Sequence, residues 1–146
     1  MICVDASVAV KWVFVEPYYQ QARALVGAAL EAGERIVAPP LLPMEITNIV
    51  RQYLRRAKPP RTEPLNFPEA AAVLGQFLSL PVELAMPTDI HEQALSLAVT
   101  YGLPAVYDAH YVALAERLGC PLWTADRNLT NTLSSKLPYV RWIGDY

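Results

Sequence analysis

VYDAHYVALAERLGCPLWTADRNL, residues 106–129, is the stretch of sequence that decides the fold. Apolar side chains recur in its first half with the spacing of an amphipathic helix, which Gly119 ends as a C-cap residue. The apolar run PLWTA at 121–125 then predicts a strand, and Asp126 ends it. A helix that leads within a few residues into an apolar strand is typical of a parallel sheet with crossover helices.

The rest of the chain alternates in the same way between short apolar runs and longer helical ones. Further strands are predicted at Ile2–Val4, Arg35–Ala38, Val82–Ala85 and Val140–Ile143. Further helices are predicted from Ala6, at 20–33, at 41–57, at 68–80 and at 89–102, the last with Thr88 as its N-cap. The sequence therefore predicts one α/β domain over residues 1–146, a three-layer α/β/α sandwich around a parallel sheet of about five strands.

Composition and charge restrict the possible functions. The chain is 53% hydrophobic and only 18% charged, so we expect a partner to cover part of its apolar surface. A net charge of −2 provides no overall attraction to nucleic acid, which leaves a local basic patch or a bound metal to hold such a substrate. Cys3 and Cys120 lie in apolar runs typical of buried, reduced thiols. The opening MICVDASVAVKWVF lacks the basic start of a signal peptide, and no segment has the length of a membrane span, so we expect a cytoplasmic protein.

Four acidic residues stand at the predicted ends of strands or starts of helices. Asp5 ends the first strand, Asp126 ends the fourth, Glu45 lies just past the second, and Asp108 starts the helix that precedes the fourth. Ligands of a doubly wound sheet bind outside the carboxyl ends of its strands, so we expect these acids to meet there. Each acid taken singly is better explained as a helix cap, and only the set of four indicates chemistry.

Carboxylates gathered at one sheet edge repel one another unless a cation compensates their charge. Oxygen ligands with open positions suit Mg²⁺ or Mn²⁺, whereas no cluster of Cys and His exists that would suit zinc. His91 and His110 are isolated in the sequence and are interpreted as ordinary helix residues. The predicted centre is therefore a magnesium or manganese site.

Polar residues close to the acids are predicted to orient them by hydrogen bonds: Ser7, Asn48, Thr124 and Asn128. Asn48 lies three residues after Glu45 and so on the same helical face, with a solvated side chain as the alternative. Trp12, Trp123 and Trp142 lie in apolar segments and are expected to pack in the core.

The segments VDAS at 4–7, MEITN at 44–48 and the 106–129 block together resemble PIN-domain ribonucleases of the VapC toxin type, over nearly the whole chain. The resemblance implies an α/β/α fold in which the four acids hold one or two divalent ions, and cleavage of RNA phosphodiester bonds by metal-activated water. Asp5, Asp108 and Asp126 would bind metal directly or through water, and Glu45 would be a further ligand or the proton acceptor. It further implies a homodimeric toxin silenced by a small antitoxin protein that inserts side chains into the acidic cleft.

The densest basic run is a candidate RNA-binding rim, because it continues from the helix that carries Glu45: Arg51, Arg55, Arg56, Lys58 and Arg61. A solvated helix face is the commoner explanation of such a run, and an acidic partner is a third.

Two other functions remain open. A receiver-like phosphoacceptor domain also uses carboxylates with Mg²⁺, but it needs paired acids after the first strand and a lysine near the last. The chain has only Asp5 at the first place, and its late lysine, Lys136, precedes the final strand. A catalytically inactive binding module with the same fold would be expected to have lost at least one of the four acids.

Overall fold

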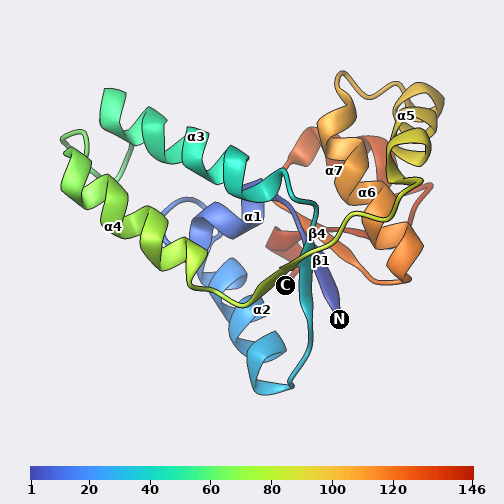
Figure 1. Cartoon of the computed structure of the whole chain (residues 1–146), viewed down its shortest axis with the longest axis horizontal. Coiled ribbons are helices and arrows are strands. Elements are labelled where there is room, and N and C mark those ends of the chain that lie inside the picture. The colour runs from blue at the N-terminus through green and yellow to red at the C-terminus, as the bar shows by residue number, and fades with distance from the viewer.

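Five short parallel strands form one sheet in the computed structural model, which describes all residues from 1 to 146 (Figure 1). The strands are β1 (Ile2–Val4), β2 (Ile36–Ala38), β3 (Val82–Leu84), β4 (Leu122–Thr124) and β5 (Val140–Trp142). They follow the order β3-β2-β1-β4-β5. Every residue of β1, β2 and β4 is buried, as expected of parallel strands covered on both faces. The predicted three-layer α/β/α fold is confirmed.

Seven α-helices connect and cover the strands: α1 (Ala6–Ala9), α2 (Tyr19–Glu31), α3 (Leu42–Arg55), α4 (Phe67–Leu78), α5 (Ile90–Tyr101), α6 (Val106–Leu118) and α7 (Arg127–Leu133). Short 3-10 turns follow α1 at Val10–Trp12 and β5 at Ile143–Asp145. Figure 1 shows α3 and α4 paired to the left of the sheet and α5, α6 and α7 to the right of it. No helix is both long and apolar enough to cross a membrane.

Several predicted boundaries shift by a residue or two, and one element was missed. Helix α7 has only seven residues and begins directly after Asp126, so it lacks the length over which an apolar period can be detected. The predicted N-cap Thr88 is wrong, because Asp89 occupies that position and its side chain makes no capping hydrogen bond. Gly119 has a φ of 62° and ends α6 as predicted, since few other residues adopt this left-handed conformation easily.

The connections of the sheet place its topological switch point between β1 and β4. The chain builds β2 and β3 on one side of β1, then returns to build β4 and β5 on the other. Asp5 and Asp126 follow the two strands that flank this point. A crevice outside the carboxyl ends of these strands is where doubly wound folds bind ligands.

The hydrophobic core agrees with the expectations from the sequence for the cysteines and for most of the tryptophans. Cys3 and Cys120 are buried free thiols, and Trp12 and Trp123 are also buried. Trp142 is only partly buried and packs beneath the guanidinium of Arg127. The expectation of core packing therefore holds fully for two of the three tryptophans.

Candidate active site

Asp5 and Asp126 are the N-cap residues of α1 and α7. Asp5 Oδ1 accepts hydrogen bonds from Ser7 Oγ at 2.6 Å and from the amide of Val8 at 3.1 Å. Asp126 Oδ1 accepts hydrogen bonds from two backbone amides of α7 at 2.7 and 3.2 Å. None of these four hydrogen bonds involves Oδ2 of either residue. Capping therefore explains how each carboxylate is held, and it leaves one oxygen of each free for a ligand.

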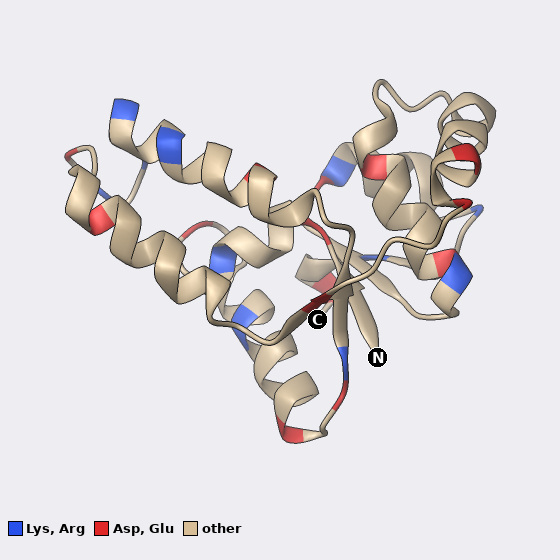
Figure 2. Cartoon of the chain, viewed as in Figure 1, with Lys and Arg blue, Asp and Glu red and all other residues tan.

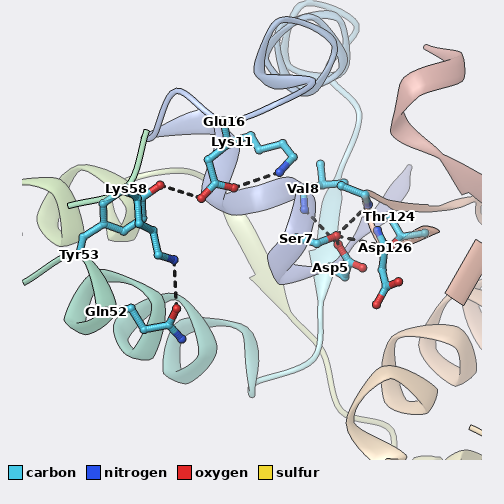
Figure 3. Close-up of polar contacts among 11 residues, drawn as sticks. Asp5, Ser7, Val8, Lys11, Glu16, Gln52, Tyr53, Lys58, Thr124 and Asp126 are labelled. Atoms are coloured by element: carbon cyan, nitrogen blue, oxygen red, sulfur yellow. Dashed lines mark hydrogen bonds and ion pairs between the residues drawn. The ribbon is translucent and has the colours of Figure 1, made fainter. Parts of the chain in front are cut away.

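Ser7 and Thr124 connect the ends of β1 and β4 (Figure 3). The Ser7 hydroxyl, which donates to Asp5, also accepts the amide N–H of Ala125 at 2.7 Å and lies 3.4 Å from Thr124 Oγ1. Thr124 Oγ1 in turn accepts the amide N–H of Asp126 at 3.0 Å. These bonds hold Asp126 beside Asp5. Ser7 bonds to a carboxylate as expected, whereas Thr124 holds the backbone of Asp126.

Glu45 lies in the first turn of α3 and is held by a residue that the sequence analysis missed. The buried hydroxyl of Tyr111 on α6 donates to Glu45 Oε2 at 2.5 Å. Tyr111 follows Asp108 by three residues, so both side chains lie on one face of α6. That spacing was the signal available in the sequence: α6 supplies one acid and the hydroxyl that positions another.

The four acids influence one another electrostatically. Asp5 is only 5% exposed, and burial raises its pKa to about 6, with a smaller contribution from the charge of Asp108. Burial raises the pKa of Glu45 as well, and Asp5 and Asp108 raise it further. The pKa of Asp108 is raised by burial and then by Asp126. No Lys, Arg or His forms an ion pair with any of the four.

This donor set fits a hard divalent cation. It consists of carboxylate oxygens, several of which take part in none of these hydrogen bonds. No basic side chain balances their negative charge. The structure contains no group of three Asp, Glu, Cys or His side chains that lie close enough together to bind one ion. Binding would therefore require the partly buried side chains of Glu45 and Asp108 to turn toward Asp5 and Asp126.

Two of the polar residues predicted to orient the acids make no such contact. Asn48 is exposed, and its side chain has no hydrogen bond to an acid. Asn128 contacts Asp126 through its backbone amide and not through its side chain. The short α7, which brings that amide to Asp126, was not foreseen, and this explains the different role of Asn128.

The basic run lies at the outer end of α3 and beyond, away from the acids (Figure 2). Arg55 is ten residues after Glu45, which corresponds to about 15 Å along the helix axis. Arg55 and Arg56 are exposed and line a surface hollow of about 390 Å³ together with Gln52. Lys58 instead bonds to Gln52 and covers the ring of Tyr53.

Of the two remaining residues of the basic run, one is paired with an acid and the other is not. Arg61 pairs with Glu69 at 3.6 Å, whereas Arg51 is exposed and makes no ion pair. Arg51, Arg55 and Arg56 are therefore the cations available to a ligand.

His91 and His110 lie on helices as expected, but they are not isolated in space. Helices α5 and α6 pack against each other and bring the two rings together, with His91 Nδ1 2.9 Å from His110 Nε2. Their separation of 19 residues hid this contact, because it depends on how the two helices pair.

Comparisons with known proteins identify the family. The PIN domain family model matches residues 2–132. Ribonuclease VapC12 of Mycobacterium tuberculosis is 35% identical over 132 residues, which cover 90% of this chain and 92% of that protein. VapC ribonuclease Mb0985 of Mycobacterium bovis is 31% identical over 138 residues, which cover 94% and 95% of the two chains.

Solved structures show the same fold. PAE2754 from Pyrobaculum aerophilum superposes with a TM-score of 0.68 at 21% identity, covering 99% of this chain and 90% of that one. Mycobacterium tuberculosis VapC20, described as a sarcin-ricin loop cleaving toxin, superposes with a TM-score of 0.65 at 17% identity, covering 97% and 99%. With a family model that spans most of the chain and relatives above 30% identity, this protein belongs to the PIN domain family, among the VapC ribonucleases.

Proposed function

We propose that the chain is a divalent-metal-dependent endoribonuclease and the toxin of a toxin–antitoxin pair. The observation that carries the proposal is the set of four carboxylates at the switch point of the sheet, which have raised pKa values or free oxygens and no cation to balance them. The names of the relatives as ribonucleases support the choice of RNA as substrate.

Each acid has a distinct part in the proposed reaction. Asp5 and Asp126 are held by helix caps with Oδ2 free, so they and Asp108 are the proposed metal ligands. A bound Mg²⁺ or Mn²⁺ would lower the pKa of a water molecule and screen the charge that develops on the phosphate oxygens. Glu45, whose pKa is raised, is suited to be a further ligand or to accept the proton of the attacking water. Tyr111 keeps Glu45 oriented through its hydrogen bond.

The proposed substrate path extends from the acids along α3. Arg51, Arg55 and Arg56 provide exposed positive charge six to eleven residues beyond Glu45, where they would hold phosphates rather than take part in cleavage. Such a local group of arginines would attract RNA although the net charge of the chain is −2.

Partners and compartment are also part of the proposal. Large apolar side chains are strongly exposed, with fractions of 65 to 75% for Met44, Phe67, Val99 and Tyr107. Met44 directly precedes Glu45, so a protein that covered Met44 would lie close to that acid. A homodimer and an antitoxin protein would cover such surface, and the free thiols suit the cytoplasm.

The receiver-like alternative has no supporting observation. Lys136, the lysine that such a site would need, packs over the ring of Tyr101. Asp5 has no second acid directly beside it in the sequence.

The test is cleavage of a structured RNA by tag-free protein in Mg²⁺ or Mn²⁺, with mapping of the cut ends. Asp108→Asn is the sharpest variant, because neither oxygen of Asp108 has a hydrogen bond to lose and only the charge changes. Glu31→Gln, an exposed position at the end of α2, is the matched control for loss of one negative charge. We expect EDTA and Asp108→Asn to abolish cutting and Glu31→Gln to preserve it. Equal cutting by all three proteins would refute the proposal.

A further inference from the structure

His91 on α5 and His110 on α6 form a pair of imidazoles that is not part of the set of four acids. His91, in the first turn of α5, is exposed, and His110 on α6 is partly buried. Their facing nitrogens lie 2.9 Å apart, with the ring planes at 67°. These are the only two histidines in the chain, and the fold brings them together.

The helices that carry the pair are held rigidly against each other. Small buried side chains of α5, Ala94 and Ala98, permit close packing on α6. Two further polar pairs link the same helices: Gln93 donates to Glu116 at 2.6 Å, and Arg117 pairs with Asp89 at 2.5 Å. The spacing of the imidazoles is therefore set by the packing of two helices and not by a flexible loop.

The backbone contact of His110 indicates which of its ring nitrogens carries the proton. His110 Nδ1 lies 2.7 Å from the carbonyl oxygen of Val106, and a carbonyl can only accept, so Nδ1 carries the proton. The lone pair of the neutral ring is then on Nε2, the atom that faces His91. A histidine whose second nitrogen donates to a backbone carbonyl has the arrangement found in most metal-bound histidines, since that bond fixes the tautomer and the ring.

The separation of the two nitrogens suits adjacent ligands of one ion. Two nitrogens at about 2.0–2.1 Å from a metal lie about 3 Å apart when they subtend a right angle, close to the observed 2.9 Å. To bind, the exposed ring of His91 must tilt so that both lone pairs point to one place, and its Nδ1 proton moves to Nε2 through solvent. Water would supply the other ligands, because no third Cys, His, Asp or Glu lies within reach.

We propose that His91 and His110 form a second metal site, distinct from the carboxylate centre and selective for late first-row divalent ions such as Cu²⁺, Ni²⁺ and Zn²⁺. Imidazole nitrogens favour these ions over Mg²⁺ and Mn²⁺, with Cu²⁺ the strongest of them. Asp108 is two residues before His110, about 200° around α6, so its side chain points away from the pair. Occupation of the site would link α5 to α6, the helix that carries Asp108 and Tyr111.

The test is calorimetric titration of Ni²⁺ into tag-free full-length protein in the presence of saturating Mg²⁺, which competes for the carboxylates. We expect one Ni²⁺ per chain, a rise in Tm on binding, and a loss of affinity of at least about tenfold in both His91→Gln and His110→Gln. Asp108→Asn is the matched control for the carboxylate centre and should bind Ni²⁺ as the wild type does.

Electron paramagnetic resonance with Cu²⁺ provides a readout that does not depend on affinity. The wild type should show hyperfine coupling to two imidazole nitrogens, and each single variant to one at most. Circular dichroism of the apo variants checks their folding, and the exposed His91→Gln serves as the test if His110→Gln does not fold. Unchanged Ni²⁺ affinity in folded His91→Gln, or loss of binding in Asp108→Asn, would overturn the proposal.

Discussion

The hydroxyl of Tyr111 donates to Glu45 Oε2 and so joins α6 to α3, although the two residues are 66 positions apart. The bond lowers the pKa of Glu45, against the effect of burial, which raises it. The hydroxyl therefore both orients this carboxylate and partly offsets the effect of burial on its pKa.

Tyr111→Phe should lower RNA cleavage by about 10- to 100-fold, because an unheld Glu45 loses its orientation. The pKa of Glu45 should also rise, so the acidic limb of the pH–rate profile moves to higher pH. Rates measured from pH 5 to 8 in saturating Mg²⁺ check both effects. Tyr107→Phe on the exposed face of α6 is the control, and a similar profile in both variants would contradict the role of Tyr111.

Ser7→Ala should lower both stability and activity. It removes the donor to Asp5 and leaves the amide of Ala125 without an acceptor, at a cost of about 1–3 kcal/mol in the free energy of unfolding. Urea denaturation measures this loss. Ser135→Ala, at an exposed serine, should be neutral, and a Ser7→Ala variant as stable and active as that control would show that the hydroxyl is dispensable.

Stability in EDTA should fall as the pH rises through the range in which Asp5 ionises. The pKa of Asp5 is about 6 in the folded chain and 3.8 for an ordinary aspartate, so between these values the folded state binds more protons than the unfolded state. The free energy of unfolding is therefore highest, as far as Asp5 is concerned, below pH 4. It falls by about 3 kcal/mol as the pH rises to about 6.

Asp5→Asn isolates this effect, since the amide cannot ionise. The difference in unfolding free energy between wild type and variant, taken from urea titrations, should change in favour of the variant as the pH increases from 4 to 7. Parallel stability curves for the two proteins would show that Asp5 is not perturbed.

The basic end of α3 should contribute to RNA affinity and not to the chemical step. In an Asp5→Asn background that cannot cut, replacing both Arg55 and Arg56 by Gln should weaken binding and reduce the slope of log K against log salt by about 1.4. Fluorescence anisotropy at several salt concentrations measures the slope. Arg23→Gln, on the exposed face of α2, should leave it unchanged, and an equal effect there would point to nonspecific attraction.

Much of the fold could be predicted because its elements are encoded locally. The buried strand β4 and the glycine that ends α6 are visible within a short window of sequence. The acids were found for the same reason, since each stands at a strand end or a helix start. Helix α7 was missed because a helix of seven residues carries too little periodic signal. The cap of α5 was misplaced by one residue because Thr88 is a good capping residue by type, whereas Asp89 takes the position without a capping hydrogen bond.

What the sequence by itself determined is the succession of the five strands and the longer helices along the chain, and the position of each acid at an element boundary. Only the tertiary structure decided that Tyr111 holds Glu45, that Asn48 faces solvent, and that His91 meets His110. The physical reason is the distance along the chain over which each signal acts. Backbone propensity and the spacing of apolar residues act over a few residues, whereas these contacts depend on how whole helices pack around the sheet.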